Sequence, residues 1–259
     1  MPGRTLISLQ GVDKRFATGV TALEGVDLQV AEEEFVSLLG PSGCGKSTVL
    51  RLAAGLDRAS AGQVASPAVG AGSAADTAFV FQDATLMPWA SVFDNVWLPL
   101  RLAGESRGNS RQRVLDALHL VGLAGFEKAF PAELSGGMRM RASIARALVT
   151  RPRLMLMDEP FAALDEFTRH KLNDDLLACW QAQRFATVFV THSVLESVYL
   201  SQRVLVMGAR PGRIVAEVVV DEPYPRSADF RESPRYHAAC GQLHAALATQ
   251  HAPVDEVVR

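Results

Sequence analysis

The chain has 259 residues, of which 48% are hydrophobic and 21% are charged, a composition typical of a globular protein with a sizeable core. A formal net charge of -2 gives no positive electrostatic field that would attract nucleic acid. The three cysteines are far apart and form no CxxC pair, which indicates reduced thiols rather than a zinc site. The first residues lack the apolar core of a secretory signal, and every apolar run is shorter than the roughly 18 residues that suggest a membrane-spanning helix. Secretion and membrane insertion are therefore not expected.

The first third of the chain is rich in short β-like segments. Alternating and apolar runs predict strands at 6–9, 26–30, 35–39 and 77–81, with a helix at 46–54. The stretch 65–76 contains only small residues, Pro, Val and Asp, so we expect a loop or a weak hairpin there.

The rest of the chain changes from helical to alternating patterns. Apolar residues at helix-like spacing predict a helical block over about 91–150. Strands are predicted at 154–157, 187–191, 203–207 and 213–220, and helices at 166–182, 194–200 and 236–247. Strands that alternate with helices favour an α/β fold with a parallel sheet. We expect one domain over 1–222, with a helical lobe of about 88–150 inserted into it, and a short C-terminal tail at 223–259.

A glycine-rich loop follows the apolar strand at 35–39. It fits the pattern GxxxxGK[ST] and consists of Gly40, Pro41, Ser42, Gly43, Cys44, Gly45, Lys46, Ser47 and Thr48. Strand, loop and helix follow in the order that this motif requires, and its backbone N–H groups can face one anion. We expect Lys46 to reach the β- and γ-phosphates of ATP and Ser47 to hold Mg²⁺.

Two acids end the apolar strand at 154–157. Ligands bind at the carboxyl ends of strands in α/β sheets, so Asp158 is placed to face Mg²⁺ beside the glycine-rich loop. Glu159 is placed to act as base or orienting group for the attacking water. This pair favours a protein that hydrolyses ATP over a passive nucleotide switch.

A second possible anion site begins another helix. Ser135 fits a helix N-cap, and Gly136 and Gly137 leave the helix end open to close approach by an anion. One glycine-rich loop suffices for one ATP, so this second helix start makes sense if it closes over the nucleotide of a neighbouring copy.

Together these motifs resemble the ATPases of ABC transporters. The resemblance covers the chain from about 8 to 220 and rests on motifs that occur in the family's order. They are Walker A at 40–48, the Q-loop at Gln82, the signature at 134–138, Walker B at 154–159, the D-loop at 163–165 and the H-loop at His192. The resemblance implies a P-loop NTPase fold with an N-terminal antiparallel β subdomain and an inserted helical lobe.

The resemblance also implies a head-to-tail dimer, whether of identical or of paired ATPase subunits, with two ATPs at the interface. Ser135, Gly136, Gly137 and Asp165 would contact the partner's nucleotide site. Gln82 would contact Mg²⁺ and the attacking water, and it would link the nucleotide site to an integral membrane permease. His192 would contact the γ-phosphate, and Phe16 would stack on adenine where a Tyr is more usual.

Three sequence features bear on the transporter class. Together they look like the nitrate, sulfonate and taurine class of importer ATPases, and they are the segment 82–96, the LSGGM sequence and the segment 210–214. The resemblance implies a subunit that lies peripherally on the cytoplasmic face of the inner membrane. Its link to a solute-binding protein would be indirect. Leu86, Met87, Pro88 and Trp89 form an apolar run that is either a docking surface for the permease or part of the lobe's packing. The cargo stays open.

Two other functions remain as alternatives. A P-loop kinase would need an acceptor pocket and has no use for Ser135–Met138. An ATP-gated interaction module would bind ATP without repeated turnover, which Glu159 disfavours. A separate expectation concerns Cys44: a helix N-terminus lowers a thiol pKa, so alkylation should inhibit and MgATP should protect.

Overall fold

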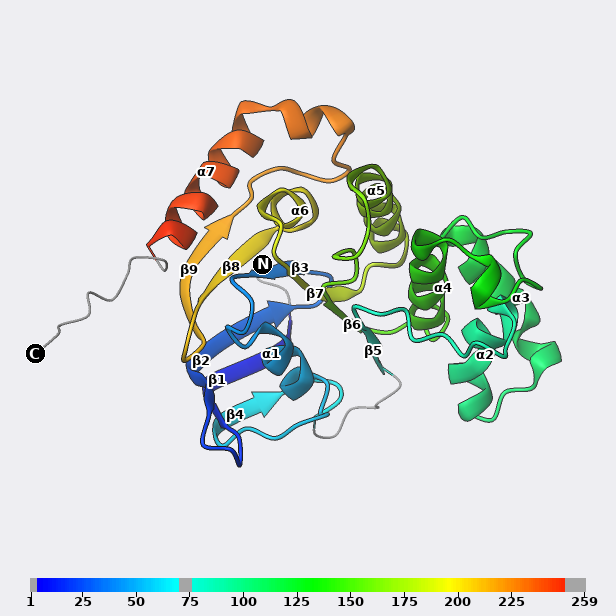
Figure 1. Ribbon diagram of the computed structural model, residues 1–259, viewed down its shortest axis with the longest axis horizontal. Helices are drawn as coiled ribbons and strands as arrows, with labels where there is room; N and C mark the ends of the chain where they lie inside the picture. The colour runs from blue at the N-terminus through cyan, green and yellow to red at the C-terminus, as the bar shows by residue number, and fades with distance from the viewer. Residues whose placement is uncertain (1–3, 70–75, 250–259) are drawn as a thin grey trace, which may run out of the picture.

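The structure is a computed structural model, and it describes residues 4–69 and 76–249. Its larger sheet has six strands in the order β5-β6-β7-β3-β8-β9 (Figure 1). The first five strands are parallel and β9 is antiparallel to β8. Their bounds are β3 Phe35–Leu39, β5 Thr77–Val80, β6 Leu154–Asp158, β7 Ala186–Thr191, β8 Arg203–Gly208 and β9 Arg213–Val219. The predicted α/β fold with a parallel core is therefore confirmed.

A smaller antiparallel sheet covers one side of this core. Its order is β2-β1-β4, with β1 at Thr5–Arg15, β2 at Thr21–Ala31 and β4 at Ala61–Ala65. The strands predicted at 6–9 and 26–30 are thus the middles of longer strands. No strand was predicted at β4, because Ala61–Ala65 carries little β-branched or aromatic content and is mostly exposed. The expected loop or hairpin at 65–76 has a bridge between Ser66 and Val69, and 70–75 lie outside the described residues.

The two faces of the larger sheet bury two separate cores. Along β3, Phe35 and Leu39 face one core while Val36 and Leu38 face the other, and all are buried. Such two-sided burial gives a continuous apolar strand instead of an alternating one. Helix α1 (Lys46–Ala53) lies on the side of the small sheet, and α5 (Glu166–Gln183) and α6 (Val194–Leu200) lie on the other (Figure 1).

The helical block forms a lobe beyond the β5 edge of the sheet (Figure 1). Its elements are α2 Val92–Leu102, α3 Arg107–Leu120, the 3₁₀ turn η2 Pro131–Glu133 and α4 Gly136–Leu148. Ser91 and Ser106 cap the starts of α2 and α3 by accepting backbone N–H groups three residues on. The lobe is therefore a set of individually capped helices whose α4 packs back on β5 and α5.

The C-terminal segment returns over α6. It contains the 3₁₀ turn η3 (Ala228–Glu232) and α7 (Pro234–Ala248), close to the helix predicted at 236–247. Buried Arg226 donates to the carbonyls of Val198, Tyr199 and Ser201 at the end of α6. A cation at a helix C-terminus is favourable because the last carbonyls there lack partners within the helix. The tail is thus anchored to the helix that follows His192.

Candidate ATP site

Three neighbouring parallel strands, β6, β7 and β3, end at the same edge of the sheet. Strands β3 and β7 are in register from Phe35↔Thr187 to Leu39↔Thr191, and β6 pairs its Asp158 with Val190. The sequence-predicted residues follow these strand ends directly, as Gly40, Glu159 and His192 do. Residues 111 or more positions apart in the sequence therefore meet at one edge.

The loop 40–48 is shaped by glycines in tight contact with the fold. Gly45 has φ +95°, and a Cβ there would lie 2.6 Å from Leu23 Cδ2. A Cβ at Gly40 would lie 2.6 Å from the Met207 carbonyl oxygen. Larger residues at these two positions would push the loop off the sheet, so the glycines fix where α1 starts. Pro41 is half-buried, and Ser42 and Gly43 are exposed at the tip of the loop.

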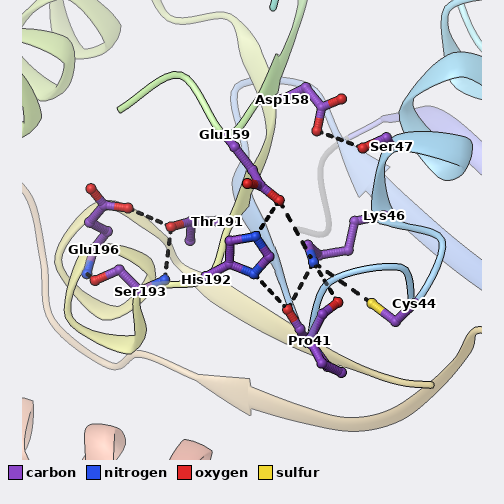
Figure 2. Close-up of polar contacts among 11 residues, drawn as sticks. Pro41, Cys44, Lys46, Ser47, Asp158, Glu159, Thr191, His192, Ser193 and Glu196 are labelled. Carbon is purple, nitrogen blue, oxygen red and sulfur yellow. Dashed lines mark hydrogen bonds and ion pairs between the residues drawn. The ribbon is translucent and has the colours of Figure 1, made fainter. Parts of the chain in front are cut away.

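Lys46 lies in this loop with its ammonium facing Glu159, the acid that directly follows β6. Its Nζ donates to the carbonyls of Gly40 (2.8 Å) and Pro41 (2.9 Å) and lies 3.9 Å from Glu159 Oε1 (Figure 2). The side chain is buried, and burial of a charge is costly unless it is paired. This buried cation lies at the start of α1, the position at which the sequence analysis expects a phosphate-binding lysine.

Glu159 occupies an unusual backbone conformation. Its φ is +48°, which is uncommon for a residue with a Cβ, and its N–H donates to the Val190 carbonyl at 3.0 Å. The carboxylate is only 16% exposed and accepts from His192 Nε2 at 2.6 Å, while His192 Nδ1 lies 3.0 Å from the Gly40 carbonyl (Figure 2). The acid is thus aimed into the site and is not the solvated start of a helix.

Ser47 and Asp158 bring two oxygen donors together. The Ser47 hydroxyl donates to Asp158 Oδ1 at 2.9 Å. Burial, and the nearby charge of Glu159, raise the pKa of the Asp158 carboxyl, and the Ser47 bond opposes that change. A hydroxyl and a carboxylate are the hard ligands that Mg²⁺ prefers, and Mg²⁺ commonly takes only one or two protein ligands beside phosphate. These residues therefore fit the ion.

The other predicted contacts are less closely assembled. Gln82 is exposed on the loop after β5, and among the described residues its side chain makes no hydrogen bond to Ser47 or Asp158. Phe16 is 41% exposed in the turn between β1 and β2, with Lys14 Nζ 5.2 Å from its ring centroid. Thr48 lies half-buried in the first turn of α1.

Ser135, Gly136 and Gly137 are not brought to this edge of their own subunit. Ser135 caps α4 by accepting from Met138 N at 3.2 Å, and α4 lies in the lobe with strands of the larger sheet between it and α1 (Figure 1). Gly136 is exposed, whereas Gly137 is buried against Thr168 of α5. Asp165 caps α5 by accepting from Thr168 N at 3.0 Å, and that bond lowers the pKa of its exposed carboxyl.

Cys44 corrects one sequence-based expectation. Its side chain is fully buried, and burial raises the pKa of the thiol, opposed by the charge of Lys46, whose Nζ lies 3.8 Å from Sγ. The expected low pKa is therefore wrong, because burial outweighs the helix N-terminus, and a raised thiol pKa argues against ready alkylation.

The network behind His192 was missed in the sequence. Thr191 donates to buried Glu196, and the backbone N–H of Ser193 donates to Thr191 Oγ1 at 3.0 Å. Burial raises the pKa of the Glu196 carboxyl, opposed by the bond from Thr191. An acid five residues after the strand end, in an otherwise apolar helix start, is the only signal that could have found it.

This arrangement agrees with the comparisons with known proteins. The ABC transporter family model matches residues 23–162. The chain belongs to the ABC transporter ATPase family. It is 46% identical to the taurine import ATP-binding protein TauB of Rhizobium johnstonii, over 80% of this chain and 79% of that protein. It is 45% identical to the aliphatic sulfonates import ATP-binding protein SsuB 1 of Pseudomonas savastanoi, over 83% and 86%.

A solved structure extends the likeness to three dimensions. The dimeric structure of an ATP-binding cassette bound to ADP and Pi, in a post-hydrolysis state, superposes with a TM-score of 0.74 at 31% identity. The match covers 84% of this chain and 100% of that one. The P-loop NTPase fold, with its antiparallel subdomain and inserted lobe, and the ATPase activity are those of the family. None of the described helices of this chain is long and apolar enough to cross a bilayer.

Proposed function

We propose that this ABC ATPase is the ATP-hydrolysing subunit of an importer of sulfonates, taurine or a related small solute, acting as a dimer on a separate membrane permease. The observation that carries the proposal is the division of the site. Lys46, Glu159 and His192 are assembled at one sheet edge, while Ser135 and Gly136 form an exposed helix start elsewhere. Two copies arranged head to tail would complete each site.

The residues at the sheet edge have distinct roles in hydrolysis. Lys46 and the N–H groups of the loop 40–48 bind the β- and γ-phosphates. Ser47 and Asp158, with Gln82 as a further oxygen donor, would hold Mg²⁺, which would supply positive charge to offset that of the phosphates. Glu159 orients the attacking water and accepts its proton, and His192 holds the Glu159 carboxylate and contacts the γ-phosphate.

Residues of the helical lobe complete the ATP site of the partner copy. The N-terminus of α4 carries a partial positive charge and unpaired N–H groups, which suit the γ-phosphate of the partner's ATP. Ser135, Gly136 and Gly137 lie at this tip, and Asp165 faces the same interface from the start of α5. Bulk water, as distinct from the attacking water, is excluded from the nucleotide only when the copies close. Hydrolysis therefore depends on dimer formation.

The permease docks at the border of the lobe. Here a groove of about 670 Å³ is lined largely by apolar side chains of β5 and α2, with Phe81 at 42% and Leu102 at 79% exposure. Trp89 is 77% exposed in the loop that follows Gln82, whereas Leu86 packs on the main core. Within the apolar run at 86–89, Leu86 therefore packs in the lobe, and exposed Trp89 is available for docking the permease. A subunit docked on the permease in this way lies peripherally at the cytoplasmic side of the inner membrane, with a solute-binding protein acting across the bilayer.

Mixing two inactive variants tests the divided site. Lys46→Ala removes the phosphate ligand of one copy. Gly136→Asp adds a negative charge at the tip of α4, where a Cβ would have ordinary contact with Leu164 at 3.5 Å, so the fold tolerates it. Each variant alone should lose hydrolysis, and random mixed dimers should regain about a quarter of the wild-type sites.

Phosphate release without an added acceptor is the measurement. It separates this ATPase from a P-loop kinase, which needs an acceptor, and from a binding module, which shows no repeated turnover. A mixture that stays inactive although both variants dimerise with wild-type protein would rule out the head-to-tail arrangement. Importer function is tested separately by restored uptake of taurine or a sulfonate when the wild-type chain is returned to a deletion strain.

A further inference from the structure

One buried acid holds both neighbours of His192. Glu196 Oε2 accepts from the Thr191 hydroxyl, and the Glu196 backbone N–H donates to Ser193 Oγ at 3.2 Å (Figure 2). The Ser193 N–H in turn donates to Thr191 Oγ1 at 3.0 Å. The residues on either side of His192 are thus fixed to one side chain that is only 6% exposed.

The same acid faces a cation on a different element. Arg169, one turn into α5, lies with its Nε 3.6 Å from Glu196 Oε1. Arg169 also donates from Nη2 to the Leu164 carbonyl at 2.9 Å. Leu164 belongs to the segment 163–165 that ends at the cap Asp165. A row of neighbouring groups therefore runs from the residues on either side of His192, through Glu196 and Arg169, to that segment.

The central contact of this chain is incomplete. Arg169 Nε and Glu196 Oε1 are both buried, and within the described residues neither makes a hydrogen bond. Buried polar atoms are rarely left in this condition, so a pair facing each other at 3.6 Å calls for an explanation. A cavity of about 270 Å³ adjoins them, lined also by Glu159, Ala162 and His192, which leaves room for the pair to close.

We propose that Glu196 and Arg169 are positioning residues that couple His192 to the segment 163–165, so that closure of the dimer on that segment sets the His192–Glu159 contact for hydrolysis. The inference rests on the proposed dimeric ATPase function and deepens it. The 3.6 Å contact shortens to a hydrogen bond when the partner engages Asp165. Such a shift is expected as a switch between two arrangements, because packed cores and interfaces do not deform continuously.

Conservative substitutions in the full-length chain test the pair. Glu196→Gln keeps the size of the side chain and an acceptor for Thr191 but removes the charge that faces Arg169, and Arg169→Lys keeps the charge without the Nε–H. We expect kcat for ATP to fall by about 2- to 30-fold in each, which is the range for residues along a coupling network. The KM for ATP should change by less than about twofold, because neither residue touches the nucleotide.

A matched control comes from the opposite end of the same strands. Glu34 accepts from Arg203 Nε at 2.6 Å and is likewise mostly buried, but it lies before β3 and away from the site. Glu34→Gln should lower the melting temperature like Glu196→Gln and leave kcat unchanged. The double variant Glu196→Gln/Arg169→Lys should be no slower than the slower single variant, because the two residues act as one unit.

Mixed dimers locate the effect. In the Lys46→Ala plus Gly136→Asp mixture, only one site is complete, and its lobe side comes from the Lys46→Ala copy. Arg169→Lys should slow this site when it is placed in the Gly136→Asp copy, because that copy supplies the working His192 and the Arg169–Glu196 contact behind it. No effect in that copy, or an effect confined to the Lys46→Ala copy, would overturn the coupling.

The remaining outcomes are also decisive. Wild-type kcat in Glu196→Gln, or a loss equal to that of Glu34→Gln, overturns the inference while the wild-type protein still hydrolyses ATP. Wild-type protein that neither hydrolyses ATP nor dimerises with it contradicts the proposed function instead. If Glu196→Gln does not fold, Arg169→Lys alone decides, since its side chain is 30% exposed and tolerates the change.

Discussion

The sheet-edge half of the site and the lobe half differ in how far each is assembled within one copy. At the sheet edge, Lys46, Glu159 and His192 already contact one another, and both ring nitrogens of His192 have partners. At the lobe, Ser135 and Asp165 make only the local bonds of helix caps, and Gly136 is exposed. The binding groups at the sheet edge are therefore preorganised within one copy, whereas the lobe half acts on ATP only in the head-to-tail dimer that we propose.

The largest effect should come from the sheet-edge half, through Glu159→Gln. The amide keeps the shape of the side chain but cannot accept a proton, so kcat should fall by about 10²- to 10⁴-fold, the usual contribution of a general base. ATP binding should persist, because Lys46 and the loop are unchanged.

Gel filtration with and without ATP gives the second readout for Glu159→Gln. With hydrolysis blocked, ATP should hold the two copies together and the variant should elute as a dimer. A monomer with bound ATP would contradict the head-to-tail dimer, since the lobe half would then complete no second nucleotide site. Normal turnover in this variant would show that Glu159 is not the base.

A smaller effect distinguishes the two glycines of the lobe half. A Cβ at Gly137 would lie 2.8 Å from Thr168 Cγ2, whereas a Cβ at Gly136 meets Leu164 at 3.5 Å. Gly137→Ala should therefore strain the packing of α4 on α5 and cost about 1–3 kcal/mol of unfolding free energy, as overpacking does. Gly136→Ala should leave stability nearly unchanged and affect only the ATP-dependent dimer. Urea unfolding of both variants, with identical m-values, makes the measurement; equal stabilities would contradict the packing described here.

Phe16 gives a modest prediction about the outer border of the sheet-edge half. Its ring is partly exposed and carries no hydroxyl, but stacking on a base needs only the ring face. Phe16→Ala should raise the KM for ATP by about 3- to 10-fold, in line with the 0.5–1.5 kcal/mol of an aromatic contact, and leave kcat unchanged. Phe16→Tyr is the control and should behave as wild type. A KM that Phe16→Ala does not alter would remove the residue from the site.

Residues adjacent to strand ends were the most predictable part of the molecule. Asp158 ends one apolar strand and the loop of Lys46 follows another, and the parallel sheet brings those strand ends together, so the pattern locates both residues. His192 was identified only through the resemblance to the family. Glu196 and Arg169 could not be found this way, because their contact joins two helices and depends on how α5 and α6 pack. Strand β4 was missed for a similar reason: its pairing with β1, and not its own composition, makes it a strand.

Cys44 shows the limit of reasoning from local position and gives the smallest expected effect. A thiol near the start of α1 resembles a reactive cysteine, yet its side chain has no exposed surface and burial raises its pKa. A raised pKa lowers the thiolate fraction at every pH below it, and the thiolate is the species that reacts. At pH 8 iodoacetamide should therefore modify Cys44 more slowly than a free cysteine, with no loss of ATPase activity over that time. Mass spectrometry of the peptide containing Cys44, with activity measured in parallel, makes the comparison. Rapid labelling in the absence of nucleotide would show that the loop 40–48 opens in solution, and the sheet-edge half would then be less preorganised than its contacts indicate.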